Sequence, residues 1–98
     1  MKKYRIDIKP TAENDLARRY AQTAKESPQN AVNWYLGLIE AIEKLVELAE
    51  RCPVAPEDMD LQRGIRHLIV GDYRVLYVIE YETVGVLHVR HVKHERRL

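Results

Sequence analysis

The change of hydrophobic period along the chain is the feature that most restricts its fold. Apolar residues recur three and four positions apart between residues 11 and 51, whereas they alternate with other residues from Ile65 to Val92. A period near 3.6 is typical of helices and a period of two is typical of strands. Tyr4 to Lys9 also alternates. The sequence therefore predicts an α+β fold in the order β-α-α-β-β-β, with two N-terminal helices packed on an antiparallel sheet.

The predicted helices have recognisable ends. Pro10 stops the first strand, and Thr11 is the expected cap of the first helix. Ser27 and Pro28 start the second helix, since serine is a good cap and proline loses no hydrogen bond at the first helical position. That helix is expected to reach Cys52, followed by a loop over residues 54–62.

Turn chemistry predicts how the last three strands pair. Gly71-Asp72 suits a two-residue type II′ turn, which requires glycine at its first central position. This turn places Val70 opposite Tyr73 and, further along, Arg66 opposite Tyr77. If Glu82-Thr83 is the next turn, Arg74 lies beside His91, although a bulge would shift these last pairs.

Both faces of the predicted sheet are apolar. Two helices can cover one face well but not both, so the other face suggests a partner that covers it. The alternative is that the first helix or the C-terminal tail folds over this face. The residues expected on the less covered face include Ile65, Ile69, Leu76, Val78, Leu87 and Val89.

The same face predicts an anion-binding site. Arg74 and His91 are expected to lie together there, with His67 one row away. A cation beside an imidazole makes a plausible anion site, and the arginine should oppose protonation of the histidine.

Composition limits the class of protein. The 98 residues carry a net charge of +1 and suit one domain spanning 1–98. The single cysteine excludes an internal disulfide. Apolar runs are too short to cross a membrane, and no signal-peptide pattern follows Met1. We expect a cytoplasmic protein.

Three histidines near the C-terminus do not predict a metal site. His88, His91 and His94 are three residues apart, which would bring them together on a helix. In a strand they point to alternating faces, and no nearby acid or cysteine completes a ligand set. We therefore expect no metal and no cofactor.

Several motifs together resemble the RelE/ParE superfamily of toxins, most closely the ParE-type proteins also called plasmid stabilisation proteins. They run in order and spacing over nearly the whole chain: residues 11–16, 64–68, 71–77 and 86–91. The resemblance implies the toxin of a type II toxin–antitoxin pair, held inactive by a cognate antitoxin. ParE-type members are understood to poison DNA gyrase, and their antitoxin complexes can bind operator DNA.

The resemblance leaves two alternatives open. One is a RelE-like, metal-independent mRNA endoribonuclease using Arg74 with His91 or His94. The glutamate at position 95 and the absence of a tyrosine beyond Tyr81 argue against it. The other is an inactive relative that only binds its antitoxin.

The expected site residues form two sets. Target binding is assigned to seven cationic side chains, namely Arg66, Arg74, Arg90, His91, Lys93, Arg96 and Arg97. Antitoxin binding is assigned to Leu76, Val78, Leu87 and Val89. Arg66 also has a structural interpretation, with its stem packed on Tyr77 and its head at the sheet rim.

Overall fold

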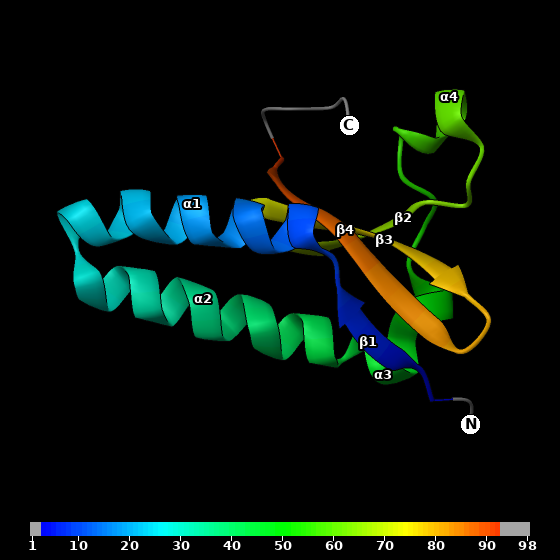
Figure 1. The fold of residues 1–98 in the computed structure, drawn as a ribbon, viewed down its shortest axis with the longest axis horizontal. Coiled ribbons are helices and arrows are strands. Elements are labelled where there is room, and N and C mark those ends of the chain that lie inside the picture. Colours follow the sequence, from blue (N-terminus) through cyan, green and yellow to red (C-terminus); the bar gives the residue numbers. More distant parts are fainter. Residues whose placement is uncertain (1–2, 93–98) are drawn as a thin grey trace.

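A four-stranded sheet with a helical hairpin packed on one face forms the molecule (Figure 1). The structure is a computed structural model, and it describes residues 3–92. The elements are β1 (Arg5–Ile8), α1 (Pro10–Glu26), α2 (Pro28–Glu43), α3 (Leu45–Leu48), the 3₁₀ turn η1 (Ala49–Arg51), α4 (Asp58–Leu61), β2 (Arg66–Val70), β3 (Tyr73–Glu80) and β4 (Thr83–His91). The strand order is β1-β4-β3-β2. The predicted fold class is confirmed, with the addition that β1 runs parallel to β4.

The helix starts follow the predicted chemistry in one case and depart from it in the other. Ser27 caps α2, since its hydroxyl accepts a hydrogen bond from the Asn30 amide at 3.2 Å. The prediction that Thr11 caps α1 is wrong, because α1 already begins at Pro10. The Thr11 hydroxyl instead donates to the Leu87 carbonyl at 2.5 Å and ties α1 to β4.

The predicted second helix and loop are each subdivided. The helix breaks at Lys44, so that α3 and η1 continue the chain to Arg51. The segment expected to be a loop contains the short helix α4. We call residues 53–65 the strap, because this segment crosses the sheet face opposite α1 and α2.

Two turns set the strand register. The β2–β3 register is confirmed, and Gly71 occupies the left-handed region at φ +59°. The prediction for β3–β4 is wrong, because Glu80 pairs with Thr83 and Tyr81 turns the chain at φ +58°. A bulge near Leu76 adds a further shift, so Tyr73 pairs with His91 and Arg74 pairs with Arg90.

This register separates two residues that were expected to lie together. A shift of one residue moves a side chain to the opposite sheet face. His91 therefore lies on the helix side, against the Tyr73 ring, whereas Arg74 lies on the strap side beside Glu57. The predicted Arg74–His91 anion site is not formed.

Each sheet face carries its own buried cluster. Tyr77, Leu38, Ile42, Val75 and Val86 are among the residues packed between the sheet and the helices. On the other face Ala55 and Ile65 from the strap enclose Leu76 and Val78.

The prediction that this second face needs a partner's cover is wrong for Leu76 and Val78, which are 0% and 3% exposed. Within residues 3–92, their cover comes from the strap and not from the first helix, and the tail that was the other candidate lies outside the described residues. Val89 was also misplaced, since it pairs with Val75 and belongs to the helix-side cluster.

Backbone contacts hold the strap in place. The Ala55 amide donates to the Ile65 carbonyl at 2.8 Å, and the His67 amide donates to the Pro53 carbonyl at 3.1 Å. The Asp58 carboxylate accepts from the amides of Arg63 and Ile65. These bonds give hydrogen-bond partners to backbone groups of the strap, which has no regular strand pairing to supply them.

Over residues 3–92, no helix combines the length and apolar character needed to cross a membrane.

Candidate functional site

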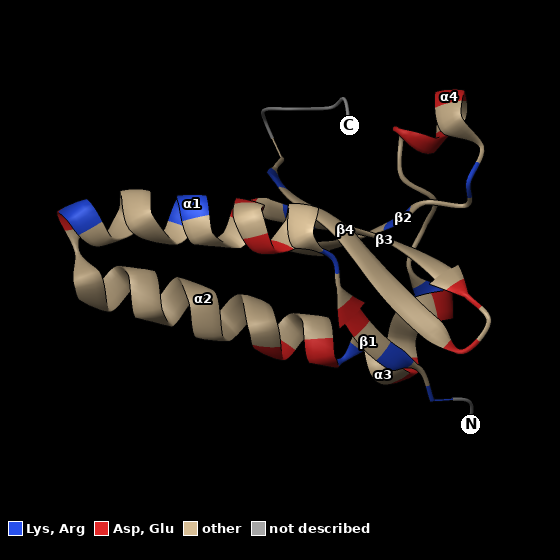
Figure 2. Cartoon of the chain, viewed as in Figure 1, with Lys and Arg blue, Asp and Glu red and all other residues tan. Residues whose placement is uncertain are grey.

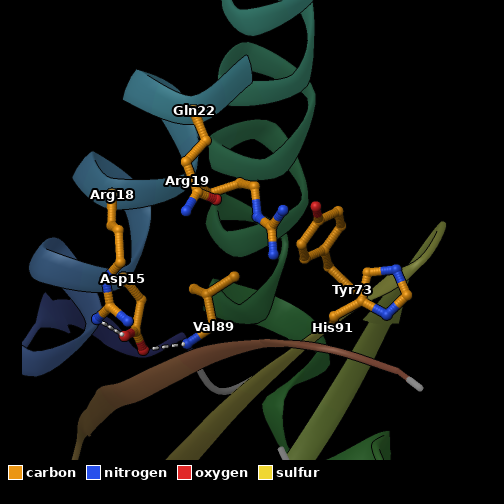
Figure 3. Close-up of a pocket in the computed structure, with 7 residues that line it drawn as sticks. All are labelled: Asp15, Arg18, Arg19, Gln22, Tyr73, Val89 and His91. Atoms are coloured by element: carbon orange, nitrogen blue, oxygen red, sulfur yellow. Dashed lines mark hydrogen bonds and ion pairs between the residues drawn. The ribbon is translucent and has the colours of Figure 1, made fainter. Parts of the chain in front are cut away.

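A polar cleft opens between α1 and the end of the sheet where β3 begins and β4 ends (Figure 3). Its volume is about 390 Å³. Four of its residues lie three, four or seven positions apart along one side of α1, and the other three come from the two strands. The lining residues are Asp15, Arg18, Arg19, Gln22, Tyr73, Val89 and His91.

Asp15 fixes α1 against the edge of β4. Pairing with β1 stops at Val86, so the next part of the β4 edge needs other partners. The Val89 amide donates to Asp15 Oδ2 at 3.0 Å, and His88 Nδ1 lies 3.1 Å from the same oxygen. Arg18 Nη2 donates to Asp15 Oδ1 at 3.2 Å. Both carboxylate oxygens of Asp15 thus have partners within the protein. These contacts hold the α1 side of the cleft against β4.

An aromatic chain positions the second arginine. The Arg19 guanidinium lies over the Tyr73 ring, with Cζ 5.5 Å from the centroid. Tyr73 in turn meets Trp34 and His91 edge-on, at centroid distances of 5.4 and 5.3 Å. Such a cation–π contact limits the orientations available to the guanidinium. Figure 3 shows Arg19 directed into the cleft toward Tyr73.

Charge is distributed unevenly around this cleft. Figure 2 shows cations in the middle of α1, whereas α2 carries only acids near its C-terminal end. Within the part of the chain that is described, Arg18 is paired with Asp15 and Arg19 has no ion pair. Among residues 3–92, the cleft therefore presents one cation, Arg19, whose charge no carboxylate balances.

A second charged cluster lies on the strap side of the sheet. Arg74 and Glu57 form a bidentate pair, with Nη1–Oε1 at 3.0 Å and Nη2–Oε2 at 2.5 Å. Their side chains are only 6% and 2% exposed. His67 Nδ1 lies 3.2 Å from Arg74 Nη1.

The environment moves the pKa values of two groups in this cluster. Burial alone would raise the pKa of Glu57, but the hydrogen bonds and charge of Arg74 outweigh it and hold that pKa below its usual value. Burial, and then the charge of Arg74, lowers the pKa of His67. The cluster is thus an ionised Arg–Glu pair beside a neutral imidazole at neutral pH.

The other residues expected at the site are scattered. Arg66 Nη1 donates to the Cys52 carbonyl at 2.5 Å, which ties the end of the helical region to β2. Arg90 Nη2 lies 3.4 Å from His88 Nδ1 at the edge of the cleft region. Leu87 is half-buried and packs against the strap-side cluster. Lys93, His94, Arg96 and Arg97 lie outside the described residues.

Sequence reasoning missed most of the cleft. One face of α1 carries Asp15, Arg18, Arg19 and Gln22. Their spacing of three, four and seven residues from Asp15 was the only sign in the sequence that they share this face. Tyr73 and Glu57 carried no such signal, because only the sheet register and the course of the strap bring them to their partners. Among residues 3–92, no three His, Cys, Asp or Glu side chains converge as metal ligands would.

Solved structures define the class of protein to which this fold belongs. One, described as the chromosomal ParDE TA system from P. aeruginosa, superposes with a TM-score of 0.77 at 16% identity, over 91% of this chain and 96% of that one. Another, the toxin–antitoxin complex RelBE2 from Mycobacterium tuberculosis, gives 0.61 at 25% identity, over 91% and 98%. The architecture is that of small α+β proteins of the RelE/ParE superfamily.

The family follows from the sequence match. Residues 6–96 match the family described as "ParE toxin of type II toxin-antitoxin system, parDE". The chain belongs to this family, and the predicted superfamily is confirmed. No curated protein matches the sequence significantly.

Proposed function

We propose that this protein is a ParE-like toxin that inhibits DNA gyrase and is neutralised by a cognate antitoxin. The family match over residues 6–96 and the fold support the toxin class. The choice of gyrase over messenger RNA depends on the state of Arg74.

The buried Arg74–Glu57 ion pair is the observation that favours gyrase over messenger RNA as the target. Metal-free RNA cleavage needs a cation free to stabilise the charge on a phosphate. Arg74 already has both terminal nitrogens bound to a buried carboxylate. His91 lies on the opposite sheet face, so it does not converge with Arg74 on one substrate. These contacts favour the non-nuclease function.

An antitoxin partner is supported by the two structural relatives, both described as toxin–antitoxin systems. An antitoxin that contacts Leu76 or Val78 would have to displace the strap, because these side chains are enclosed. Leu87 is half-buried and so more accessible. In this proposal the complex also binds operator DNA through the antitoxin.

The C-terminal end of β4 is our proposed target surface. Arg90 and His91 lie there, and the chain continues into Lys93, Arg96 and Arg97. Arg66 is a weaker candidate, since its guanidinium already binds the Cys52 carbonyl.

The alternative, a ribonuclease using Arg74 with His91 or His94, requires the strap to release Arg74. The third possibility, an inactive relative that only binds antitoxin, is compatible with the same fold. The near-neutral charge of the chain also fits poorly with a protein whose affinity would depend on ribosomal phosphates.

Expression of the chain alone in bacteria tests the proposal. Growth arrest with an SOS response, intact messenger RNA and loss of supercoiling by purified gyrase is the expected result. Rapid message cleavage without an effect on gyrase would establish the ribonuclease instead. Normal growth with good levels of folded protein would favour the inactive relative.

A paired variant sharpens this test. Arg74→Met combined with Glu57→Leu removes both buried charges together, which keeps the fold from holding one charge alone. The proposed function expects this variant to arrest growth as the wild type does. A nuclease that depends on Arg74 would lose its activity in the same variant.

A further inference from the structure

We propose that the cleft between α1 and β4 is a socket for one carboxylate side chain, presented by an acidic segment of the cognate antitoxin. This inference rests on the proposed toxin function for the identity of the partner, whereas the chemistry of the socket comes from the cleft itself.

Arg19 is the group that recognises the carboxylate. Arg19 Cζ lies over the Tyr73 ring, 5.5 Å from its centroid, and the guanidinium is directed into the cleft (Figure 3). An arginine held against an aromatic ring in this way loses less conformational freedom when it binds, and its planar fork matches a carboxylate bidentately. Among residues 3–92 no acid pairs with Arg19, so none of these residues competes with an incoming carboxylate.

The charge of the cleft suits one anionic group. Arg18 and Arg19 stand against a single acid, Asp15. Asp15 is already bound by the Val89 amide and by Arg18. One carboxylate added beside Arg19 would neutralise the remaining charge without displacing any of these bonds.

The walls of the cleft suit a protein side chain. A volume of about 390 Å³ holds a complete glutamate side chain. Val89 and the Tyr73 ring offer apolar surface to its methylene groups, and Gln22 offers an amide donor at the rim.

A nucleic acid is the less suitable occupant. It would present a row of phosphates, and its affinity depends on a row of cations that release counterions. This cleft is a single socket in a chain whose net charge is only +1. We therefore commit to a carboxylate on an acidic protein segment.

The position of the socket explains how its occupation neutralises the toxin. His91 lines the cleft and also belongs to the proposed target surface. An antitoxin side chain bound at Arg19 therefore brings its backbone across the end of β4, where it obstructs the target.

The first experiment tests the chemistry of the socket without the antitoxin. The full chain is titrated with N-acetylglutamate methylamide while NMR follows the Arg19 Nε–Hε and Tyr73 ring signals. Saturable shifts that weaken with salt are expected, together with no saturation by N-acetylglutamine methylamide. No saturation by the carboxylate, equal saturation by the amide, or tighter binding of a short oligonucleotide would overturn the inference.

Matched variants locate the effect. Arg19→Gln should abolish the saturable shifts, and Arg19→Lys should weaken them while keeping the charge. Lys25→Gln removes one charge from the same helix outside the cleft and should titrate as the wild type does. Thermal unfolding of each variant verifies that it folds.

The second experiment tests the partner. Calorimetry measures the affinity of each variant for the cognate antitoxin. Arg19→Gln should weaken binding about tenfold or more, as expected for loss of a charge-assisted hydrogen bond, and Lys25→Gln should not. Unchanged affinity in Arg19→Gln would overturn the inference. Failure of the wild-type chain to arrest growth would instead refute the proposed function, and the NMR titration would still decide the socket.

Discussion

At the scale of single residues, Arg74 and Glu57 depend on each other for their stability. Their two charges are almost wholly buried and satisfy each other through two hydrogen bonds. Removing water from both charges opposes folding, while their attraction at short distance offsets this cost. Loss of one partner is therefore far more harmful than loss of both.

Glu57→Ala should lower the free energy of unfolding by about 3–5 kcal/mol, because Arg74 would remain buried without a counter-ion. Urea denaturation followed by Trp34 fluorescence measures this change. The Glu57→Leu and Arg74→Met double variant serves as the control and should regain most of the loss. A change below about 1 kcal/mol for Glu57→Ala would indicate a pair screened by water.

Protonation of His67 should make stability depend on pH. The folded pKa lies below the ordinary value of 6.5, so the unfolded chain binds more protons as the pH falls below that value. Stability should hence decrease from about pH 6.5 downward until the folded pKa is reached. Glu57 contributes a separate loss only below its ordinary value of 4.5, because its folded pKa is lowered.

His67→Gln isolates the histidine contribution, since glutamine keeps an acceptor for Arg74 but does not titrate. Urea unfolding at a series of pH values between about 7.5 and 5 should show a flatter profile for this variant than for the wild type. Equal slopes in the two proteins would contradict the assignment to His67.

At the scale of elements, α1 replaces a missing strand at the edge of β4. β1 pairs with only the first part of β4. The remaining edge is covered by Thr11, which binds the Leu87 carbonyl, and by Asp15, which binds the Val89 amide. These contacts lie where the β3–β4 register shifts, at the bulge near Leu76. α1 therefore stabilises the register that directs His91 toward the helices.

Asp15→Ala should destabilise the protein by about 1–3 kcal/mol, because the Val89 amide would lose its acceptor. Hydrogen exchange at the Val89 amide should accelerate more than exchange in the centre of β3. Asp15→Asn keeps an oxygen acceptor and should cost less. An unchanged Val89 exchange rate in Asp15→Ala would show that this bond does not hold the edge.

At the scale of the whole molecule, both sheet faces carry a cluster buried by the protein's own chain, although Ile69 on the strap side remains 60% exposed. The helical hairpin covers one face, and the strap covers the other with Ala55 and Ile65. The strap, a segment that is not part of the sheet, thus covers the apolar residues Leu76 and Val78 on the second face. This arrangement leaves the polar cleft, and not an apolar sheet face, as the main candidate surface for a partner.

Leu76→Ala on the strap side and Leu38→Ala on the helix side should each cost about 2–5 kcal/mol in the isolated protein. Both side chains are enclosed, at 0% and 2% exposure. Denaturant unfolding of the two variants without any partner measures the comparison. A much smaller cost for Leu76→Ala would mean that the strap does not close its face in solution.

Local chemistry explains which parts of this structure could be predicted. Hydrophobic period identified the helices and strands, and Ser27-Pro28 located the start of α2. The β2–β3 register followed from Gly71, because a two-residue turn leaves one pairing. Arg19 and its neighbours on α1 were visible only as a helical spacing, without an indication of what they face.

By itself, the sequence determined the α+β class, the order of the four strands and two long helices, the first hairpin and the family resemblance, because each depends on residues close together within short segments of the chain. The tertiary structure alone decided the β3–β4 register, the pairing of Arg74 with Glu57 and the cleft around Arg19. The physical reason is that these features depend on contacts between distant segments: α1 with the β4 edge, and the strap with the far face of the sheet. A one-residue shift in register was sufficient to exchange the residues that meet on each face.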